Sequence, residues 1–389
     1  MHHLEFADWS PAEYWSAAKS CSTWHIQEGQ ASEELESVFR REYGLSSIYA
    51  VNAGRTALAI ALTLLMRRAP KRRKVIIPAY ICPSVVAQIT LCGLDTAFVD
   101  IDDDLNIAPR AIANALDNDT LAVVAPHMYG APCQIAAIEG LCRDAGVGLI
   151  DDAAQVVGVR AGSRMLGTFG DFGLVSFAQS KAIVTGFGGS GGMLFVNNPE
   201  FVDESAAFIA TLPRPSARVR YLGCFIWSYL LHRYTNSADY YMSRAASRLN
   251  LRLPPITAAR IANLDAAVAL VQWRRLQKIM AARIRIAEAY QVALAKIPQF
   301  SLPQYASGRF LTRLMLELPT GIDSRTARAH LLSLGIETRM PYPEIHASSE
   351  PQSNATRLRA KLIEVPSSVR LGQDDIASIC SQFISLLAL

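Results

Sequence analysis

The chain has 389 residues, 51% of them hydrophobic and 19% charged, which is enough for a large domain and a smaller one. Lys and Arg outnumber Asp and Glu by only 38 to 34, so a nucleic-acid partner is not indicated. The sequence lacks the long apolar run that a membrane span needs, and its N-terminus lacks the basic-then-apolar order of a signal peptide. The seven cysteines show no zinc-like spacing. We therefore expect no metal site, reduced thiols and a cytoplasmic protein.

Short apolar strands alternate with helices as far as Asp152. Helical patterns cover residues 33–43 and 57–68, and a basic connector, 67–74, leads to the strand pattern 75–77. The further elements expected, in chain order, are a helix at 84–93, a strand at 96–100, a helix at 109–116, a strand at 121–125, a helix at 134–145 and a strand at 147–151. This alternation indicates βαβ units and a parallel sheet, an α/β fold.

After Asp152 the pattern changes. We expect strands at 171–177 and 192–196, a helix near 199–211, an aromatic-rich segment at 219–234, a long helix at about 258–297, a strand at 311–318, and helices at 324–334 and 374–389. The sequence therefore predicts a large α/β domain over residues 1–250. The remainder, 251–389, is predicted to hold a long linking helix and a small C-terminal α+β domain.

A lysine and an acid follow two of the expected strands. Lys181 comes after the strand pattern 173–177 and before the glycine-rich run 186–192, while Asp152 ends an earlier strand. Carboxyl ends of parallel strands meet at one edge of a sheet, where α/β proteins bind ligands. A lysine amine can hold the aldehyde of pyridoxal 5′-phosphate (PLP), and a carboxylate can keep its pyridine nitrogen protonated. We predict Lys181 and Asp152 as catalytic residues, with Asp151 as the alternative acid.

Three further residues lie where PLP would need partners. Gly54 lies at a helix N-terminus, where unpaired amides suit a phosphate, although it could serve only as a helix cap. Gln155 is one helical turn beyond Asp152 and could reach the phenolic oxygen of the ring, and Ser176 could donate its hydroxyl to the phosphate. The glycine-rich run precedes a strand and opens no helix, so it fails as a dinucleotide-binding motif.

Other polar segments favour structural roles. The acidic run 100–104 is expected to be a solvated turn, and His127 a strand-end residue satisfied by hydrogen bonds. The connector 67–74 is expected to be a solvated loop, with docking of an anionic substrate or carrier as the alternative. Segment 219–234 is interpreted as a subunit contact or a lid, and a peripheral lipid contact is a further alternative.

Taken together, these motifs resemble the DegT/StrS family of PLP-dependent aminotransferases, which have PLP fold type I. The matching segments are 52–58, 78–84, 98–102, 127–130, 151–155 and 176–181. The resemblance implies a mainly parallel seven-stranded sheet flanked by helices, with a smaller C-terminal α+β domain. It implies these cofactor-binding residues: Gly54, Arg55, Thr56, Cys82, Asp152, Gln155, Ser176 and Lys181. Cys82 aligns with the family's aromatic ring over the cofactor, with Tyr80 as the alternative.

The resemblance also implies the activity. A homodimer would move an amino group from an amino-acid donor, Glu or Gln, to a keto or aldehyde acceptor such as a sugar, through a Lys181 aldimine. Another PLP reaction, such as elimination or decarboxylation, is the first alternative. A PLP-binding regulatory protein without turnover is the second. Family members that dehydrate their substrate carry His at the lysine position, so Lys181 favours transamination.

Overall fold

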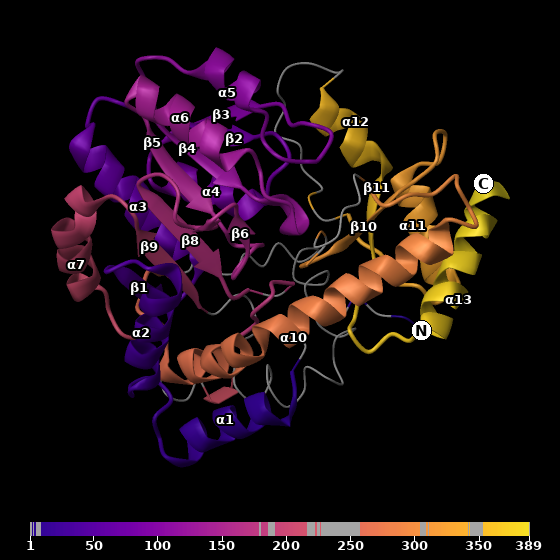
Figure 1. Cartoon of the computed structure of the whole chain (residues 1–389), viewed down its shortest axis with the longest axis horizontal. Coiled ribbons are helices and arrows are strands. Elements are labelled where there is room, and N and C mark those ends of the chain that lie inside the picture. Colours follow the sequence, from indigo (N-terminus) through magenta and orange to yellow (C-terminus); the bar gives the residue numbers. More distant parts are fainter. Residues whose placement is uncertain are drawn as a thin grey trace.

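A seven-stranded sheet forms the centre of the larger part of the molecule (Figure 1). The computed structural model describes residues 2, 4, 9–178, 180–185, 191–215, 222, 223, 226, 257–303, 309, 311–340, 342 and 353–388. The strand order is β1 (Ile48–Val51), β9 (Gly192–Val196), β8 (Phe172–Ser176), β5 (Gly148–Asp152), β4 (Thr120–Pro126), β2 (Lys74–Pro78) and β3 (Asp95–Val99). Strands β8, β5, β4, β2 and β3 are parallel, and β9 is antiparallel to both its neighbours. Every residue of the interior strand β4 is buried, as expected for a parallel strand covered on both faces.

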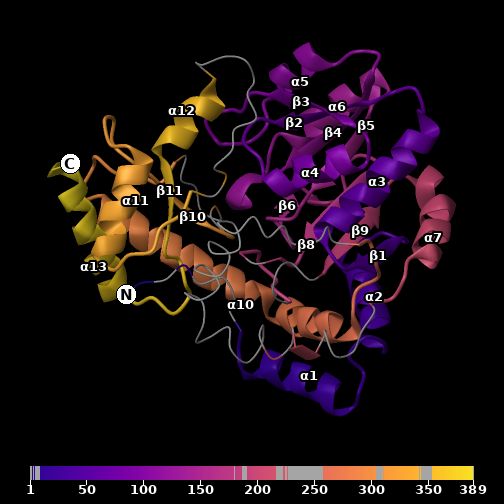
Figure 2. The ribbon, with the colours of Figure 1, turned by 180° about the vertical axis from the view of Figure 1, so that it is seen from behind.

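Helices cover both faces of this sheet, as the two views show (Figures 1 and 2). One face packs against α3 (Gly54–Arg68), α4 (Pro83–Leu91) and α7 (Val202–Thr211), which follows the short helix η2 (Pro199–Phe201). The other face packs against α2 (Ala31–Tyr43), α5 (Pro109–Ala115), α6 (Ile135–Ala145) and the first half of α10 (Asn263–Leu294). Their apolar side chains form two separate clusters, one on each side of the sheet. The result is a three-layer α/β/α arrangement.

Helix α10 connects this part to a smaller C-terminal part (Figure 1). With 32 residues it is about 48 Å long. Its second half packs against the two-stranded sheet of β10 (Leu314–Glu317) and β11 (Leu362–Val365), and against α11 (Ser324–Ser333), α12 (Asn354–Lys361), α13 (Gln373–Phe383) and η4 (Ile384–Ala388). Helix α1 (Pro11–Ser22) packs on α10 from outside. The small hairpin of β6 (Arg160–Ala161) and β7 (Arg164–Met165) and the helix η1 (Met128–Gly130) complete the described elements.

The predicted fold class is confirmed, and most predicted elements lie within a few residues of their expected bounds. The long helix is shorter than expected at both ends. Among the described elements, seven were not predicted: α1, β1, η1, β6, β7, α12 and β11. The division of the chain at residue 250 stays a prediction. Segment 219–234 lies outside the described residues except for 222, 223 and 226, and so does the run 186–190. In the part that the structure describes, no helix is long and apolar enough to cross a membrane.

Candidate active site

A cavity of about 250 Å³ lies at the carboxyl edge of the sheet. It is formed by the ends of β5 and β8, the N-terminus of α3, and residues from the C-terminal part. Seven of the eight residues predicted for the cofactor line it: Gly54, Arg55, Cys82, Asp152, Gln155, Ser176 and Lys181. Thr56 does not, because its backbone N–H donates to Ala53 O at 3.0 Å and its hydroxyl to Asn52 Oδ1 at 2.7 Å. The sequence motifs therefore converge, with Thr56 in a supporting position.

The start of α3 is arranged to receive an anion. Ala53, the residue that caps α3, has no side chain that could accept from the first helical amides. A Cβ atom built on Gly54 would lie 2.8 Å from Cβ of Ser176, so these backbones approach as closely as glycine allows. The hydroxyl of Ser176 accepts the Ala178 N–H at 3.3 Å, which leaves its own hydrogen free to donate. The amides at Gly54 and Arg55 and this hydroxyl thus suit a phosphate.

Replacing Gly54 with Ala should weaken PLP binding about tenfold or more, about 1.4 kcal/mol, because the added methyl group must push Ser176 away from the phosphate position. Fluorescence titration of the apoprotein with PLP measures this. Gly140 in α6 is the matched control, because a Cβ there would meet only the Arg143 guanidinium, at 3.8 Å. Gly140→Ala should keep wild-type affinity, and equal affinity of the two variants would remove Gly54 from the phosphate site.

The two adjacent acids at the end of β5 have separate environments. Asp151 is fully buried, and its Oδ2 accepts the N–H groups of Gly167 and Phe169 at 2.6 and 3.1 Å. Its Oδ1 lies 2.7 Å from Nε2 of His127, whose Nδ1 accepts the Cys133 N–H at 3.0 Å. The imidazole proton therefore lies on Nε2 and points at Asp151. His127 is satisfied by hydrogen bonds, as predicted.

Asp152 instead faces the cavity and Lys181. Its Oδ1 accepts one protein hydrogen bond, from the Ala154 N–H at 3.0 Å. Burial raises the pKa of Asp152, and the nearby Lys181 opposes that shift. Of the two acids, Asp152 is therefore the one available to a ligand, and Asp151 is held by the protein.

Lys181 lies on a turn that distant parts of the chain hold in place. Val184, three residues on, exchanges two hydrogen bonds with the Gln272 side chain of α10, at 3.0 and 2.6 Å. The indole N–H of Trp9 also donates to Val184 O, at 2.9 Å. Burial lowers the pKa of Lys181, the neighbouring Cys82 and Asp152 oppose this shift, and Arg313 adds to it. A lysine with a lowered pKa is more often neutral, and so more nucleophilic, than a solvated one.

Gln155 and Cys82 occupy two further sides of the cavity. The amide Nε2 of Gln155 donates to the Tyr342 hydroxyl at 3.3 Å, and its Oε1 accepts from the Thr312 hydroxyl at 3.1 Å. Sγ of Cys82 lies 3.1 Å from Oγ of Ser84. Tyr80, the alternative for the ring position, is buried with its hydroxyl 2.7 Å from that of Tyr129, and it does not line the cavity in the described chain. The geometry therefore favours Cys82 over Tyr80.

Two residues of the C-terminal part line the same cavity and were not singled out from the sequence: Arg313, one residue before β10, and Tyr342. The Arg313 guanidinium lies 5.7 Å from the centre of the Tyr342 ring. Arg313 lies inside a predicted strand, where nothing in the local sequence indicates that it belongs to a site. Tyr342 lies in a Pro-Tyr-Pro sequence without a periodic pattern.

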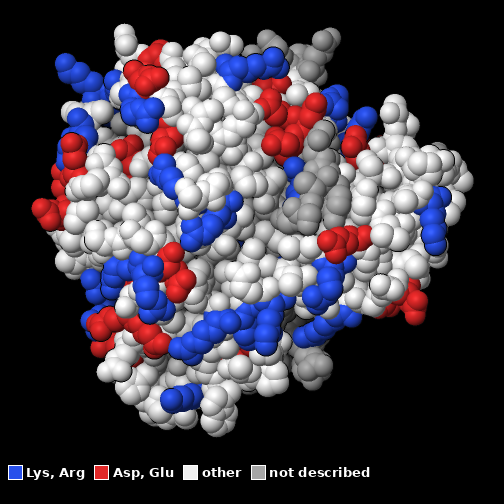
Figure 3. Space-filling model, in the orientation of Figure 1, with Lys and Arg blue, Asp and Glu red and all other residues white. Residues whose placement is uncertain are grey.

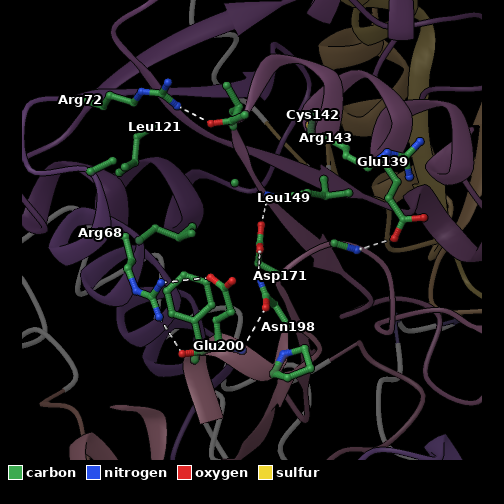
Figure 4. Close-up of a pocket in the computed structure, with 18 residues that line it drawn as sticks. Arg68, Arg72, Leu121, Glu139, Cys142, Arg143, Leu149, Asp171, Asn198 and Glu200 are labelled. Atoms are coloured by element: carbon green, nitrogen blue, oxygen red, sulfur yellow. Dashed lines mark hydrogen bonds and ion pairs between the residues drawn. The ribbon is translucent and has the colours of Figure 1, made fainter. Parts of the chain in front are cut away.

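A larger cavity, about 620 Å³, lies at the opposite edge of the sheet, where β4, β5 and β8 begin. Three arginines and three acids line it, and Figure 4 shows that Arg68 and Arg72 point at partners within the protein. Arg68 pairs with Glu200 at 3.0 Å, and Arg72 donates to Gly146 O at 2.6 Å. Lys74, from the same connector, donates to Ala115 O at 2.8 Å. These internal partners argue against a docking surface. Residues 69–73 form the loop, whereas Arg67 and Arg68 end α3 and Lys74 begins β2, so the predicted loop is shorter than 67–74.

The acidic run 100–104 also has a structural use. The two carboxylate oxygens of Asp100 accept the N–H groups of Asn354 and Ala355 at 2.9 and 3.0 Å, at the start of α12. Asp103 pairs with Arg357 at 2.6 Å. On the face shown in Figure 3, basic and acidic side chains both occur in small groups, and neither sign covers the face. The acids of this run thus tie the two parts of the chain together.

Several solved structures that share this fold over nearly the whole chain are aminotransferases. Helicobacter pylori PseC, an aminotransferase involved in the biosynthesis of pseudoaminic acid, is 14% identical with a TM-score of 0.80, covering 100% of this chain and 99% of its own. The aminotransferase TlmJ from Streptoalloteichus hindustanus is 22% identical with a TM-score of 0.79 and the same coverage. At these identities the likeness shows the fold, and together with the match of residues 16–384 to an aminotransferase family it places the chain among the PLP-dependent aminotransferases of fold type I.

Within that class, residues 16–384 match the DegT/DnrJ/EryC1/StrS aminotransferase family, and the chain belongs to it. A curated relative, GDP-perosamine synthase of Vibrio cholerae, is 26% identical over 375 residues, which is 92% of this chain and 92% of that protein. The fold also accommodates other chemistry. E. coli GDP-4-keto-6-deoxy-D-mannose-3-dehydratase, solved with bound hydrated PLP, has a TM-score of 0.76 at 18% identity and covers 98% of this chain and 99% of its own.

Proposed function

We propose that this chain transfers an amino group from Glu or Gln to the keto or aldehyde carbon of a sugar, with Lys181 as the cofactor lysine. The observation that carries the proposal is that Lys181 and Asp152 line one cavity and influence each other's protonation. A lysine and an acid with perturbed pKa values in one cleft are typical of a catalytic site.

The residues present fit PLP. Gly54, Arg55 and Ser176 would hold its phosphate, Asp152 the protonated ring nitrogen, and Gln155 would lie near the ring oxygen, while Cys82 would lie against one face of the ring. When bound, the cofactor supplies a ring that accepts electrons. Lys181 would hold the aldehyde carbon between turnovers. Its freed Nζ would then move the proton that leaves the donor's α carbon.

A sugar acceptor is supported by the curated relative, whose name specifies a GDP-linked amino sugar. We also propose a homodimer, because the cofactor of fold type I enzymes lies at a subunit boundary. Sedimentation of the purified protein tests this, and a monomer that retains PLP would contradict it. The alternative roles of segment 219–234 as lid, subunit contact or lipid contact stay open, since it lies outside the described residues.

The direct test is to map the cofactor. Purified protein with added PLP should show a visible absorbance band, and borohydride should fix the cofactor to the peptide that contains Lys181. Peptide mass spectrometry identifies the labelled lysine. Lys278 on α10, exposed and remote from the cavity, is the internal control and should remain unlabelled. Label on a different lysine would refute the assignment.

A second measurement separates an enzyme from a regulatory protein that only binds PLP. Glutamate or glutamine should convert bound PLP to pyridoxamine phosphate, with loss of the visible band, and keto sugars should restore it. Sugar nucleotides with a 4-keto group are the first acceptors to test, because of the curated relative. Bound PLP that no amino donor converts would favour the regulatory alternative.

A further inference from the structure

The residue before the proposed cofactor lysine has a strained backbone. Ser180 has a φ of +64°, in the left-handed region that residues with a side chain rarely adopt. Its side chain is buried, with a relative exposure of 3%. Strained residues of this kind persist only where surrounding contacts hold them, and they are concentrated at functional sites.

The contact that holds Ser180 comes from the C-terminal part. Arg313 donates to the Ser180 hydroxyl from Nε at 3.1 Å and from Nη2 at 2.9 Å. Its Nη1 lies 3.4 Å from Glu364 of β11, a carboxylate with 2% exposure. Arg339 binds the same carboxylate at 2.9–3.2 Å. The Glu364 carboxylate thus holds the Arg313 guanidinium in place, and the guanidinium binds the turn that carries Lys181 through two hydrogen bonds.

Arg313 also acts on Lys181 through its charge. The charged and titratable groups that face Lys181 are Asp152 from the end of β5, Cys82 before α4, and Arg313 before β10; Arg55 and Tyr342 also line the cavity. A fixed cation next to an amine disfavours the protonated amine. The hydrogen bonds and the charge of Arg313 therefore both act on Lys181, the first on its position and the second on its protonation.

We infer that Arg313 is a positioning residue: its hydrogen bonds to Ser180 orient Lys181, and its charge disfavours protonation of the Lys181 amine. The inference rests on the proposed role of Lys181, and nothing in the family match or the sequence motifs assigns it. In this inference the C-terminal part does more than line the cavity, because one of its residues affects the reactivity of Lys181.

Four variants separate position from charge. Arg313→Met removes both the charge and the hydrogen bonds, and Arg313→Lys keeps the charge without the two-pronged contact. Ser180→Ala removes the hydroxyl and keeps the charge, and Ser180→Gly also removes the φ strain. Glu364 keeps Arg339 as a partner in all four, so its carboxylate is not left unpaired. Arg357→Met is the control, because Arg357 is an exposed arginine of α12 whose ion-pair partner is Asp103.

The first readout is the reactivity of Lys181 in the apoprotein. Trace labelling with acetic anhydride from pH 7 to 10, with mass spectrometry of the Lys181 peptide, gives the midpoint of its deprotonation. Arg313→Met should move that midpoint to higher pH and slow labelling at pH 8 severalfold, because it removes the neighbouring cation. Arg313→Lys, Ser180→Ala, Ser180→Gly and Arg357→Met should leave it near the wild-type value. An unchanged midpoint in Arg313→Met would overturn the electrostatic half of the inference.

The second readout is the rate at which added PLP becomes covalently attached to Lys181, followed by the visible band. Arg313→Met and Ser180→Ala should each slow attachment severalfold, and the double variant should be little slower than Arg313→Met alone, because the two residues share one contact. Fully additive effects would overturn the positional half. These outcomes can be told apart from a failure of the proposed function. Borohydride labelling of another lysine would refute the function, whereas the deprotonation midpoint of Lys181 in the apoprotein would still measure the effect of Arg313.

Discussion

Lys181→Ala should lower the rate of amino transfer about 10⁴-fold, equivalent to about 5 kcal/mol of barrier, because it removes the group proposed to move the proton. PLP should still bind through its phosphate and ring contacts, but borohydride should no longer fix it to the protein. Single-turnover conversion of bound PLP by the amino donor, followed by absorbance, measures the loss. Ordinary turnover in this variant would transfer the role to another base.

Two controls accompany this variant. Small primary amines added to Lys181→Ala should restore part of the rate, since a free amine can enter the space left by the side chain. Lys278→Ala, on the exposed face of α10, should react at the wild-type rate. Failure of every amine to rescue, with the fold intact by circular dichroism, would contradict the expectation that the lost amine alone accounts for the slower rate.

Asp152→Asn should keep much of the PLP affinity and lose about 10³-fold in amino transfer, equivalent to about 4 kcal/mol, because an amide cannot stabilise a proton on the ring nitrogen as a carboxylate does. The same single-turnover assay measures the loss. The absorbance of the bound cofactor should change as well. Near-normal turnover would exclude Asp152 as the partner of the ring nitrogen.

Asp151→Asn is the matched control, because it makes the same chemical change one residue away. The new amide would direct its N–H groups either at those of Gly167 and Phe169, which now donate to Asp151, or at the Nε2–H of His127. We expect a loss of about 1–3 kcal/mol in the free energy of unfolding, from the buried donors left without an acceptor. Per folded molecule, the rate of amino transfer should stay near the wild-type value. The opposite result, a stable Asp151→Asn protein without turnover, would exchange the proposed roles of the two acids.

The sequence was most informative where the chemistry is close to regular structure. The parallel sheet follows from short apolar runs between helical patterns, and β4 shows the reason, since both its faces are covered. Gly54, Asp152 and Ser176 could be predicted because each lies at the end of a strand or the start of a helix. The choice between Asp151 and Asp152 could not be predicted. It depends on which of the two side chains points toward the backbone N–H groups of Gly167 and Phe169.

Residues that depend on distant partners were missed for the same reason. Strand β11 has the sequence Leu-Ile-Glu-Val, and a buried Glu364 contradicts the pattern of a core strand. It is tolerated because Arg313 and Arg339, far apart in sequence, both pair with it. The importance of Arg313 depends on that same pairing and on Ser180. Local periodicity contains no information about either contact.

The way the lysine turn is held has a consequence for how the protein is made. Its supports reach it across 175 residues from Trp9, 88 from Gln272 and 133 from Arg313. A nascent chain that has just released Lys181 from the ribosome lacks the last two, and closing such long loops is slow. We therefore expect stalled or truncated chains that end before residue 313 to stay unlabelled by PLP, even with every earlier motif in place. Cofactor capture would then report that the chain has been completed at least as far as Arg313.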